Sequence, residues 1–132
     1  MMRTAQKIRV LVCNRYALFR KGIKELLSQG SPIEVVGEAA TARQALRLVE
    51  RLRPDVVLMD ATMRDASGSE ATRRIKALDP GVHILIVSLD DDRLLISGCL
   101  NAGATGYVRN GDRSGKLKSA IQMACRDGAP TA

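Results

Sequence analysis

The sequence contains no tryptophan and few other aromatic residues. Two tyrosines and one phenylalanine bring the aromatic content to 2% of 132 residues, within an ordinary hydrophobic content of 45%. A core must therefore be built from aliphatic side chains, which suits packing on a sheet. The same scarcity leaves no aromatic platform on which nucleic-acid bases would stack. The length fits one domain and is too short for two.

Cysteines are also few, and long apolar runs are missing. The chain has three cysteines without metal-ligand spacing, so neither a disulfide framework nor a zinc site is indicated. No stretch approaches the roughly 20 apolar residues that span a bilayer, and the first residues lack the apolar core of a secretory signal. We therefore expect a cytoplasmic protein with no membrane partner.

Basic residues outnumber acidic ones, 21 to 14, which gives a formal net charge of +7. Clustered Lys and Arg would neutralise the phosphates of a nucleic acid. Here the basic residues are scattered and interspersed with acids such as Glu25, Glu50 and Glu70, so solvated helix faces explain them at least as well. A small basic nucleic-acid-binding protein is kept as an alternative hypothesis.

Strand-like and helix-like segments alternate along the chain. Apolar runs that predict strands occupy residues 8–13, 33–39, 56–60, 82–89 and 106–109. Helical apolar spacing is found at residues 16–29, 41–53, 68–78, 94–100 and 113–126. Thr41 is placed to cap the second helix. This alternation predicts an α/β fold in which a doubly wound, five-stranded parallel sheet carries helices on both faces.

The third predicted strand ends in a lone carboxylate, Asp60. In an open parallel sheet the carboxyl ends of the strands meet at one edge, where reacting groups gather. The residues that this topology would bring together are Cys13, Asn14, Asp60, Ser88, Arg109 and Asn110. With one carboxylate and no general base nearby, this set does not predict an enzyme that turns over a small molecule.

Six stretches carry a family resemblance. They are residues 8–12, 17–22, 35–39, 53–60, 70–75 and 102–107, which read IRVLV, ALFRKG, VVGEA, RPDVVLMD, EATRRI and AGATGY. Together they resemble the receiver domain of a bacterial two-component response regulator of the NarL/LuxR type, over about residues 8–126. The resemblance implies a flavodoxin-like sheet with strand order 2-1-3-4-5. It also implies a receiver domain over residues 1–127 and a linker starting at 128–132, before a helix-turn-helix output domain.

The resemblance further implies roles for several residues. In such receivers an aspartate accepts a phosphoryl group from a histidine kinase, and a Mg²⁺ held by acidic residues makes the transfer possible. Asp60 matches the acceptor, Ser88 the switch hydroxyl and Tyr107 the switch aromatic residue. The backbone carbonyl of Thr62 falls where the family supplies a neutral metal ligand. A homodimer, and contact with DNA through the output domain alone, are also implied.

Other positions depart from the pattern that the resemblance implies. The paired acids that follow the first strand match Cys13 and Asn14, which offer a soft thiol and a neutral amide in place of hard anionic oxygens. The lysine that follows the fifth strand matches Asn110, and the adjacent Arg109 should point the other way in a strand. The ligands left for Mg²⁺ are Asn14, Asp60 and Thr62. We therefore expect weak Mg²⁺ binding or none.

These departures leave two hypotheses for the function. In the first, the chain is an atypical receiver, a regulatory module with impaired Mg²⁺-dependent phosphorylation, and Asp60 is the remnant of an acceptor. In the second, it is a conventional receiver that accepts a phosphoryl group on Asp60 from a histidine kinase, with Arg109 replacing the missing lysine. Cys13 is either a redox thiol activated by a nearby cation or a buried structural cysteine.

Overall fold

Strands and helices alternate along residues 7–30, 32–88, 92–109 and 115–127, which this computed structural model describes. The strands are β1 (Ile8–Cys13), β2 (Ile33–Ala39), β3 (Val56–Asp60), β4 (His83–Ser88) and β5 (Gly106–Arg109). The helices are α1 (Ala17–Leu27), α2 (Ala42–Leu52), α3 (Gly68–Leu78), α4 (Arg93–Asn101) and α5 (Lys116–Asp127). None of the described helices is long and apolar enough to cross a membrane.

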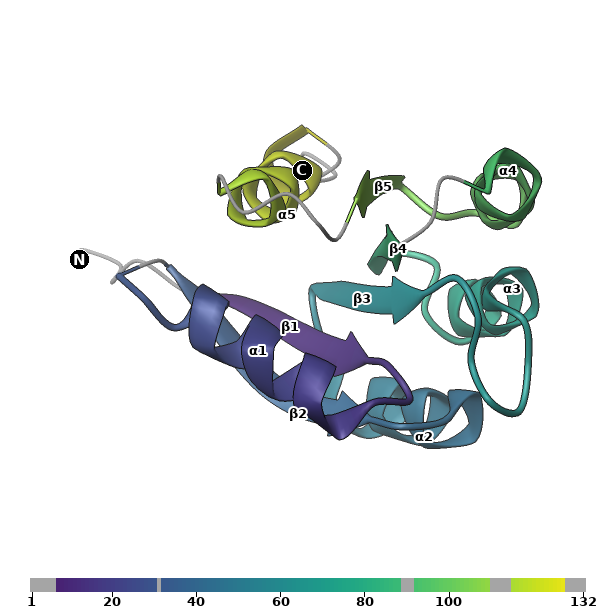
Figure 1. The fold of residues 1–132 in the computed structure, drawn as a ribbon, viewed down its shortest axis with the longest axis horizontal. Helices are drawn as coiled ribbons and strands as arrows, with labels where there is room; N and C mark the ends of the chain where they lie inside the picture. The colour runs from purple at the N-terminus through teal and green to yellow at the C-terminus, as the bar shows by residue number, and fades with distance from the viewer. Residues whose placement is uncertain (1–6, 31, 89–91, 110–114, 128–132) are drawn as a thin grey trace.

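All strand pairs are parallel, and the sheet order is β2-β1-β3-β4-β5 (Figure 1). This order confirms the predicted doubly wound sheet. The carboxyl ends of β1, β3 and β4 therefore lie next to one another at one edge, with β5 beyond them. This edge is where the sequence predicts the functional residues to gather.

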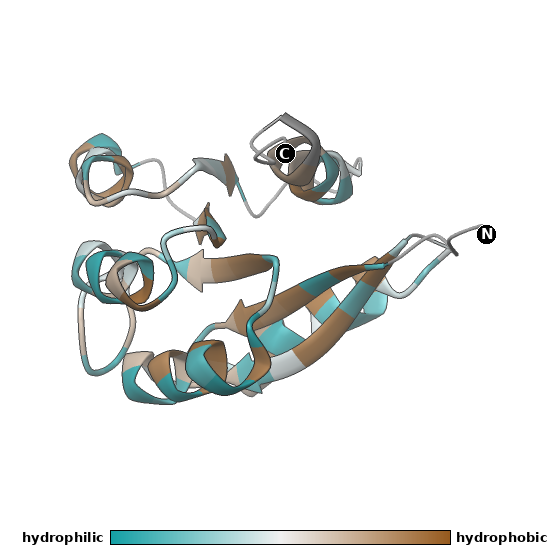
Figure 2. Cartoon of the chain, turned by 180° about the vertical axis from the view of Figure 1, so that it is seen from behind, coloured by the Kyte–Doolittle hydropathy of each residue, from teal (hydrophilic) through white to brown (hydrophobic). Residues whose placement is uncertain are grey.

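Side chains along each strand alternate between two halves of the core. Leu11, Val57 and Ile84 pack with residues of α2, α3 and α4, whereas Val10 and Leu58 pack with residues of α1 and α5. In Figure 2 the strands are mostly brown, whereas the helices carry both teal and brown segments, as expected for an apolar sheet covered by amphipathic helices. Helices thus cover both faces of the sheet, and the face that a strand residue occupies follows from its position parity.

Several predicted element ends differ from the observed ones by one to three residues. The first helix begins at Ala17 because Tyr16 has extended backbone angles, φ −99° and ψ 118°. The fourth strand begins at His83 because the Val82 N–H bonds to the Asp79 carbonyl in the preceding turn. The last helix begins at Lys116, and the predicted starting residues 113–114 lie outside the described ranges. The predicted cap is confirmed, since the Thr41 hydroxyl accepts from the Gln44 N–H at 3.1 Å.

The loop after β3 is tightly closed. The Gly68 N–H donates to the Ala61 carbonyl at 2.9 Å, and the Met63 N–H donates to the Ala66 carbonyl at 3.1 Å. A Cβ atom at Gly68 would lie 2.6 Å from the Ala61 carbonyl oxygen, so the close approach requires glycine here. This closure fixes the backbone that immediately follows Asp60.

Candidate functional site

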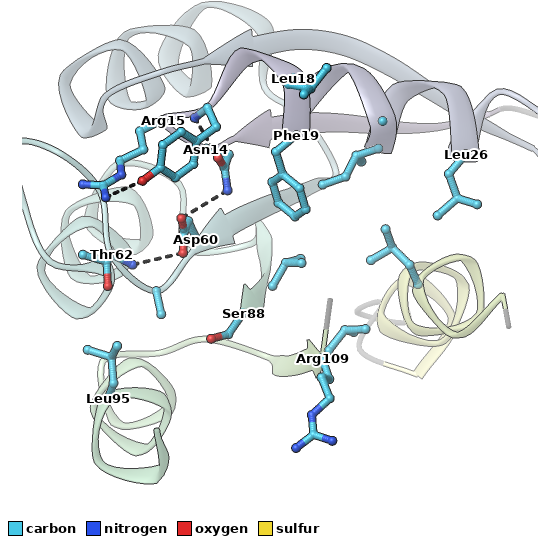
Figure 3. Close-up of a pocket in the computed structure, with 17 residues that line it drawn as sticks. Asn14, Arg15, Leu18, Phe19, Leu26, Asp60, Thr62, Ser88, Leu95 and Arg109 are labelled. Carbon is cyan, nitrogen blue, oxygen red and sulfur yellow. Dashed lines mark hydrogen bonds between the residues drawn. The ribbon is translucent and has the colours of Figure 1, made fainter. Parts of the chain in front are cut away.

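Asp60 is the last residue of β3 and is partly buried. It has the parity of Val56 and Leu58, whose side chains face α1 and α5. One carboxylate oxygen, Oδ2, accepts from the Asn14 side-chain amide at 3.1 Å, and Oδ1 accepts from the Thr62 N–H at 3.3 Å (Figure 3). The carboxylate is therefore held between the end of β1 and the loop that follows β3.

A cavity of about 950 Å³ opens beside Asp60. The predicted residues that line it are Asn14, Asp60, Thr62, Ser88 and Arg109. These residues lie at the ends of four strands or within two residues of them, as the topology predicts. The same cavity continues along α1 to Leu26 and is bounded by Leu117 of α5.

Cys13 does not reach this cavity, and the prediction that it lies there with Asn14 is wrong. Its side chain has the parity of Leu11 and packs in the opposite half of the core, between the sheet and α2. Burial raises the pKa of the Cys13 thiol well above its usual range, although the positive charge of Arg20 opposes this shift. A thiol that stays protonated is neither a metal ligand nor a reactive redox group, so the interpretation as a structural cysteine holds.

The strand β1 ends at Cys13, so the two residues that follow it are Asn14 and Arg15. The Asn14 side-chain oxygen accepts from the Tyr16 N–H at 2.8 Å, which turns its NH₂ group toward Asp60. Arg15 lines the cavity, donates to the Tyr16 hydroxyl at 2.6 Å and lies 4.8 Å from the centre of that ring. Sequence reasoning missed Arg15, because it matched the family's paired acids to Cys13 and Asn14, whereas the residues that follow the observed strand are Asn14 and Arg15.

Side chains of α1 and β2 hold the backbone of Asn14 in place. The Arg20 guanidinium donates to the Asn14 carbonyl at 2.7 Å and to the Glu38 carboxylate at 2.9 Å. Lys24 also donates to Glu38, at 2.7 Å. Hydrogen bonds from Lys24 and Arg20 hold the pKa of Glu38 below its usual range, so the carboxylate stays ionised. The ion-pair group on α1 and β2 thus positions the backbone at the end of β1.

Comparison with known sequences decides the family. A sequence profile described as the response regulator receiver domain matches residues 10–122. The chain belongs to the response regulator receiver family. It is the receiver domain of a two-component response regulator, and its relatives are of the NarL/LuxR type.

Individual relatives support this assignment of the receiver. It is 34% identical over 123 residues to the transcriptional regulatory protein DegU of Brevibacillus brevis, covering 93% of this chain and 52% of that protein. It is also 34% identical over 121 residues to the transcriptional regulatory protein LiaR of Bacillus subtilis, covering 90% of this chain and 56% of that protein. The receiver therefore spans about half the length of the curated relatives it matches.

Solved structures agree with the sequence matches. The signal receiver domain of the putative response regulator NarL from Mycobacterium tuberculosis superposes with a TM-score of 0.83 at 29% identity, covering 92% of this chain and 98% of that one. A two-component response regulator of the LuxR family from Aurantimonas sp. SI85-9A1 gives a TM-score of 0.83 at 32% identity, covering 89% and 84% of the two chains.

The remaining predicted site residues of this receiver do not all line the cavity. Ser88 is buried at the end of β4 and lines the cavity, whereas Tyr107 is 47% exposed and does not line it. Arg109 lines the cavity, but its side chain extends away from Asp60 (Figure 3). Asn110 lies outside the described residues. Among the described residues, the side chains that lie at the ends of β1 and β4 beside Asp60 are the neutral, polar Asn14 and Ser88.

Charged residues of both signs border the cavity of the receiver. The described lining residues include one acid, Asp60, and two arginines, Arg15 and Arg109. Across the described ranges, no three His, Cys, Asp or Glu side chains are grouped so that they would hold a metal ion. The Asn14 oxygen, which would be the amide ligand, is already bonded to the Tyr16 N–H. This donor set does not fit Mg²⁺, which prefers several carboxylate or water oxygens in octahedral geometry.

Proposed function

We propose that this chain is an atypical receiver, a signal-responsive module with impaired Mg²⁺-dependent phosphorylation at Asp60. The observation that carries the proposal is the pair of residues after β1. There the family's two acids are replaced by an amide, Asn14, and a guanidinium, Arg15. The local charge of the pair thereby changes from −2 to +1.

This change in charge should weaken the binding of a divalent cation. At the effective dielectric of a protein surface, two unit charges about 4 Å apart interact by roughly 4 kcal/mol. A change of three charge units at the mouth of the cavity therefore outweighs the attraction that Asp60 alone offers a divalent cation. Phosphoryl transfer depends mainly on positioning and charge neutralisation, so the loss of the metal would slow the reaction strongly.

The retained residues support a role as a regulatory module. Asp60 is still oriented by Asn14 and the Thr62 N–H, and buried Ser88 still faces the same cavity. Because the chain spans only about half of its relatives, we further propose a helix-turn-helix output domain after the linker at residues 128–132. DNA would then be contacted through that domain alone. A cytoplasmic location, a homodimer and a histidine kinase partner complete the proposal, and the module itself would catalyse no turnover.

The proposal is tested by mass spectrometry of the intact chain after incubation with acetyl phosphate and Mg²⁺. We expect less than stoichiometric modification of the native chain over a time in which a typical receiver is fully modified. The matched gain-of-function variant is Asn14→Asp with Arg15→Asp, which restores the two acids. Rapid, complete modification of the native chain that Asp60→Asn abolishes would overturn the proposal.

A second candidate is the conventional phosphorylatable receiver. The observation in its favour is that Arg109 lines the same cavity as Asp60 and Ser88, where it would replace the missing lysine by moving inward. This version predicts stoichiometric modification in the same experiment, and a further loss of the modification in the variant Arg109→Ala. Equal, low modification with and without Arg109 supports the atypical receiver instead.

A further inference from the structure

Three exposed arginines form a row along α2. Arg43, Arg47 and Arg51 follow one another at a spacing of four residues, so they share one face of the helix, with an axial rise of about 6 Å between neighbours. The buried residues of α2 belong to its other side, which packs on β1, β2 and α3. Since α2 lies at the outside of the fold (Figure 1), this arginine row faces solvent.

The charges of the arginine row are not neutralised within the chain. On the neighbouring helix α3, Arg73 and Arg74 both bind the Glu70 carboxylate, as is usual for a solvated helix face. By contrast, the three guanidinium groups of the row form no ion pair and donate no hydrogen bond among the residues that the structure describes. Solvation of a mixed-charge face therefore does not describe α2 as it describes α3.

Two acids lie near the arginine row, and neither compensates it. The charge of Arg43 acts on Asp65, but that carboxylate already accepts from the backbone N–H groups of Ala42 and Arg43. Glu50 follows Arg47 by three residues and so lies on the same face, yet no ion pair joins the two side chains. The exposed face of α2 thus keeps an excess of positive charge that Glu50 interrupts at one position.

This arrangement is unfavourable for the helix itself. Like charges four residues apart on a helix repel each other. Arg43 also lies in the first turn of α2, where the helix dipole disfavours positive charge. The fold gains no contact in return for this repulsion. A local arrangement that brings the fold no compensating gain is expected where a surface serves binding.

The charge pattern of this face limits the chemistry of a partner. Carboxylates at a spacing of four residues on another helix have the same axial rise as the arginine row and can pair with it one to one. A nucleic-acid duplex carries a negative charge about every 1.7 Å along its axis, so it would also bring phosphates against Glu50. A second copy of this chain does not supply the pattern, because each helix that the structure describes carries at most one acid.

We propose that the arginine row binds an acidic helix of another protein. Carboxylates at a spacing of four residues pair with Arg43, Arg47 and Arg51, and the partner residue opposite Glu50 is neutral or basic. The planar guanidinium group suits this role, because it can bind a carboxylate through two parallel hydrogen bonds. The inference goes beyond the proposed function, since no residue of the row lines the cavity at Asp60.

The test titrates an alanine-based helical peptide of about 20 residues, with three glutamates at a spacing of four, into the ¹⁵N-labelled chain. Saturable shifts should appear at the amides of Arg43, Arg47 and Arg51, and the affinity should fall as salt is added, because exposed charges are screened. A peptide of the same composition, with its glutamates spread around the helix, should bind at least about threefold more weakly. No saturable binding at low ionic strength, or equal binding of both peptides, would overturn the proposal.

A neutral variant of the row tests the residues themselves. The triple variant Arg43→Gln, Arg47→Gln, Arg51→Gln should bind the matched peptide about tenfold more weakly, since each exposed ion pair changes an affinity by about twofold to fivefold. Its unfolding midpoint should be no lower than that of the native chain, because the substitutions remove repulsion and break no ion pair. Unchanged binding would overturn the proposal, and so would a lowered midpoint, which would show that the arginines have partners within the fold.

A matched control separates the row from the net charge of the chain. The triple variant Lys7→Gln, Lys21→Gln, Arg93→Gln removes the same total charge at exposed positions outside α2, and it should bind the peptide as the native chain does. An equal loss of affinity in the two triple variants would mean that net charge alone attracts the peptide, and would overturn the proposal.

The class of partner is tested with two other polyanions at the same salt concentration. A duplex DNA of about 20 base pairs and vesicles that contain phosphatidylserine should both perturb the amides of α2 less than the matched peptide does. Tighter binding of either polyanion through the arginine row would overturn the assignment to an acidic helix. Peptide binding is measured by amide shifts on α2 and phosphorylation by mass, so this proposal and the proposed function fail separately.

Discussion

Both the nitrogen and the oxygen of the Asn14 side-chain amide are hydrogen-bonded, and these bonds affect whether Asp60 can share a metal ion with Asn14. The NH₂ group donates to Asp60, and the oxygen accepts from the Tyr16 N–H. To ligate a metal through that oxygen, Asn14 would have to give up both bonds. Arg15 next to it adds a positive charge. At the residue scale, Asn14 and Arg15 therefore favour a hydrogen-bonded carboxylate over a metal-bound one.

The buried hydroxyl of Thr72 allows the cost of an unsatisfied polar group in the core to be measured. It is fully buried on α3, and its hydroxyl has no hydrogen-bond partner among the described residues. Thr72→Val keeps the shape and removes the unsatisfied polar group, so it should raise the free energy of unfolding by about 1 kcal/mol. Urea denaturation measures the change. The control Thr72→Ser keeps the hydroxyl and removes a methyl group, and it should lower stability; equal stability of all three chains would contradict the account.

His83, the single histidine, predicts a pH dependence. Burial, helped by the charge of Lys76, lowers the pKa of His83 from the ordinary value of 6.5. Below pH 6.5 the unfolded chain therefore takes up the proton first, and stability falls until the pH passes the lower pKa of the folded chain. Thermal unfolding between pH 7.5 and 5.5 should show this loss, and His83→Gln should remove it. A native chain that becomes more stable as the pH falls would contradict the predicted direction of this pH dependence.

At the scale of elements, the loop after β3 is joined to the start of α2 by Asp65. Its carboxylate accepts from the Ala42 N–H at 2.7 Å and from the Arg43 N–H at 3.1 Å. These N–H groups belong to the first turn of α2, where a helix has unpaired donors and favours negative charge. The loop that carries Thr62 is thus anchored at two places, here and through Gly68 against Ala61.

Removing the Asp65 carboxylate should lower the stability of the fold. Asp65→Ala should lower the free energy of unfolding by about 1 kcal/mol, because two backbone donors lose their acceptor. Burial would raise the pKa of Asp65, but the hydrogen bonds from Ala42 and Arg43 outweigh it and leave that pKa below its usual value of 3.8. The contribution is therefore complete above that value and lost as the pH falls through the lower pKa of the folded chain. Asp65→Asn keeps an acceptor and should lose less; equal losses in both variants would contradict the assignment.

At the scale of the whole molecule, the fold was predictable and the site was predictable in part. Continuous apolar runs mark buried parallel strands, and Thr41 marks a helix start, so sheet order and most element ends follow from sequence pattern and family resemblance. Cys13 misled the site prediction because it is apolar and ends its strand. Neighbouring residues of a strand face opposite sides of the sheet, so Cys13 packs away from the cavity while Asn14, one residue later, lines it.

The cavity that continues from Asp60 along α1 to Leu117 of α5 was not predictable in the same way. Sequence spacing shows that Leu18, Gly22 and Leu26 share a face of α1, but it does not show how far that face lies from α5. The distance depends on how each helix packs on the sheet, where α1 lies against β1 and β2 and α5 lies against β3, β4 and β5. Such tertiary spacing is set by many side chains together and leaves no local signal.

A Mg²⁺ titration tests the central claim most directly. The amides of Asp60, Ala61 and Thr62 are followed by NMR in the native chain and in the double variant Asn14→Asp with Arg15→Asp. The account predicts no saturable shift in the native chain at millimolar Mg²⁺ and clear saturation in the variant, because the variant regains two anionic ligands. Saturation of the native chain at low millimolar Mg²⁺ or below, with no tighter binding by the variant, would contradict it.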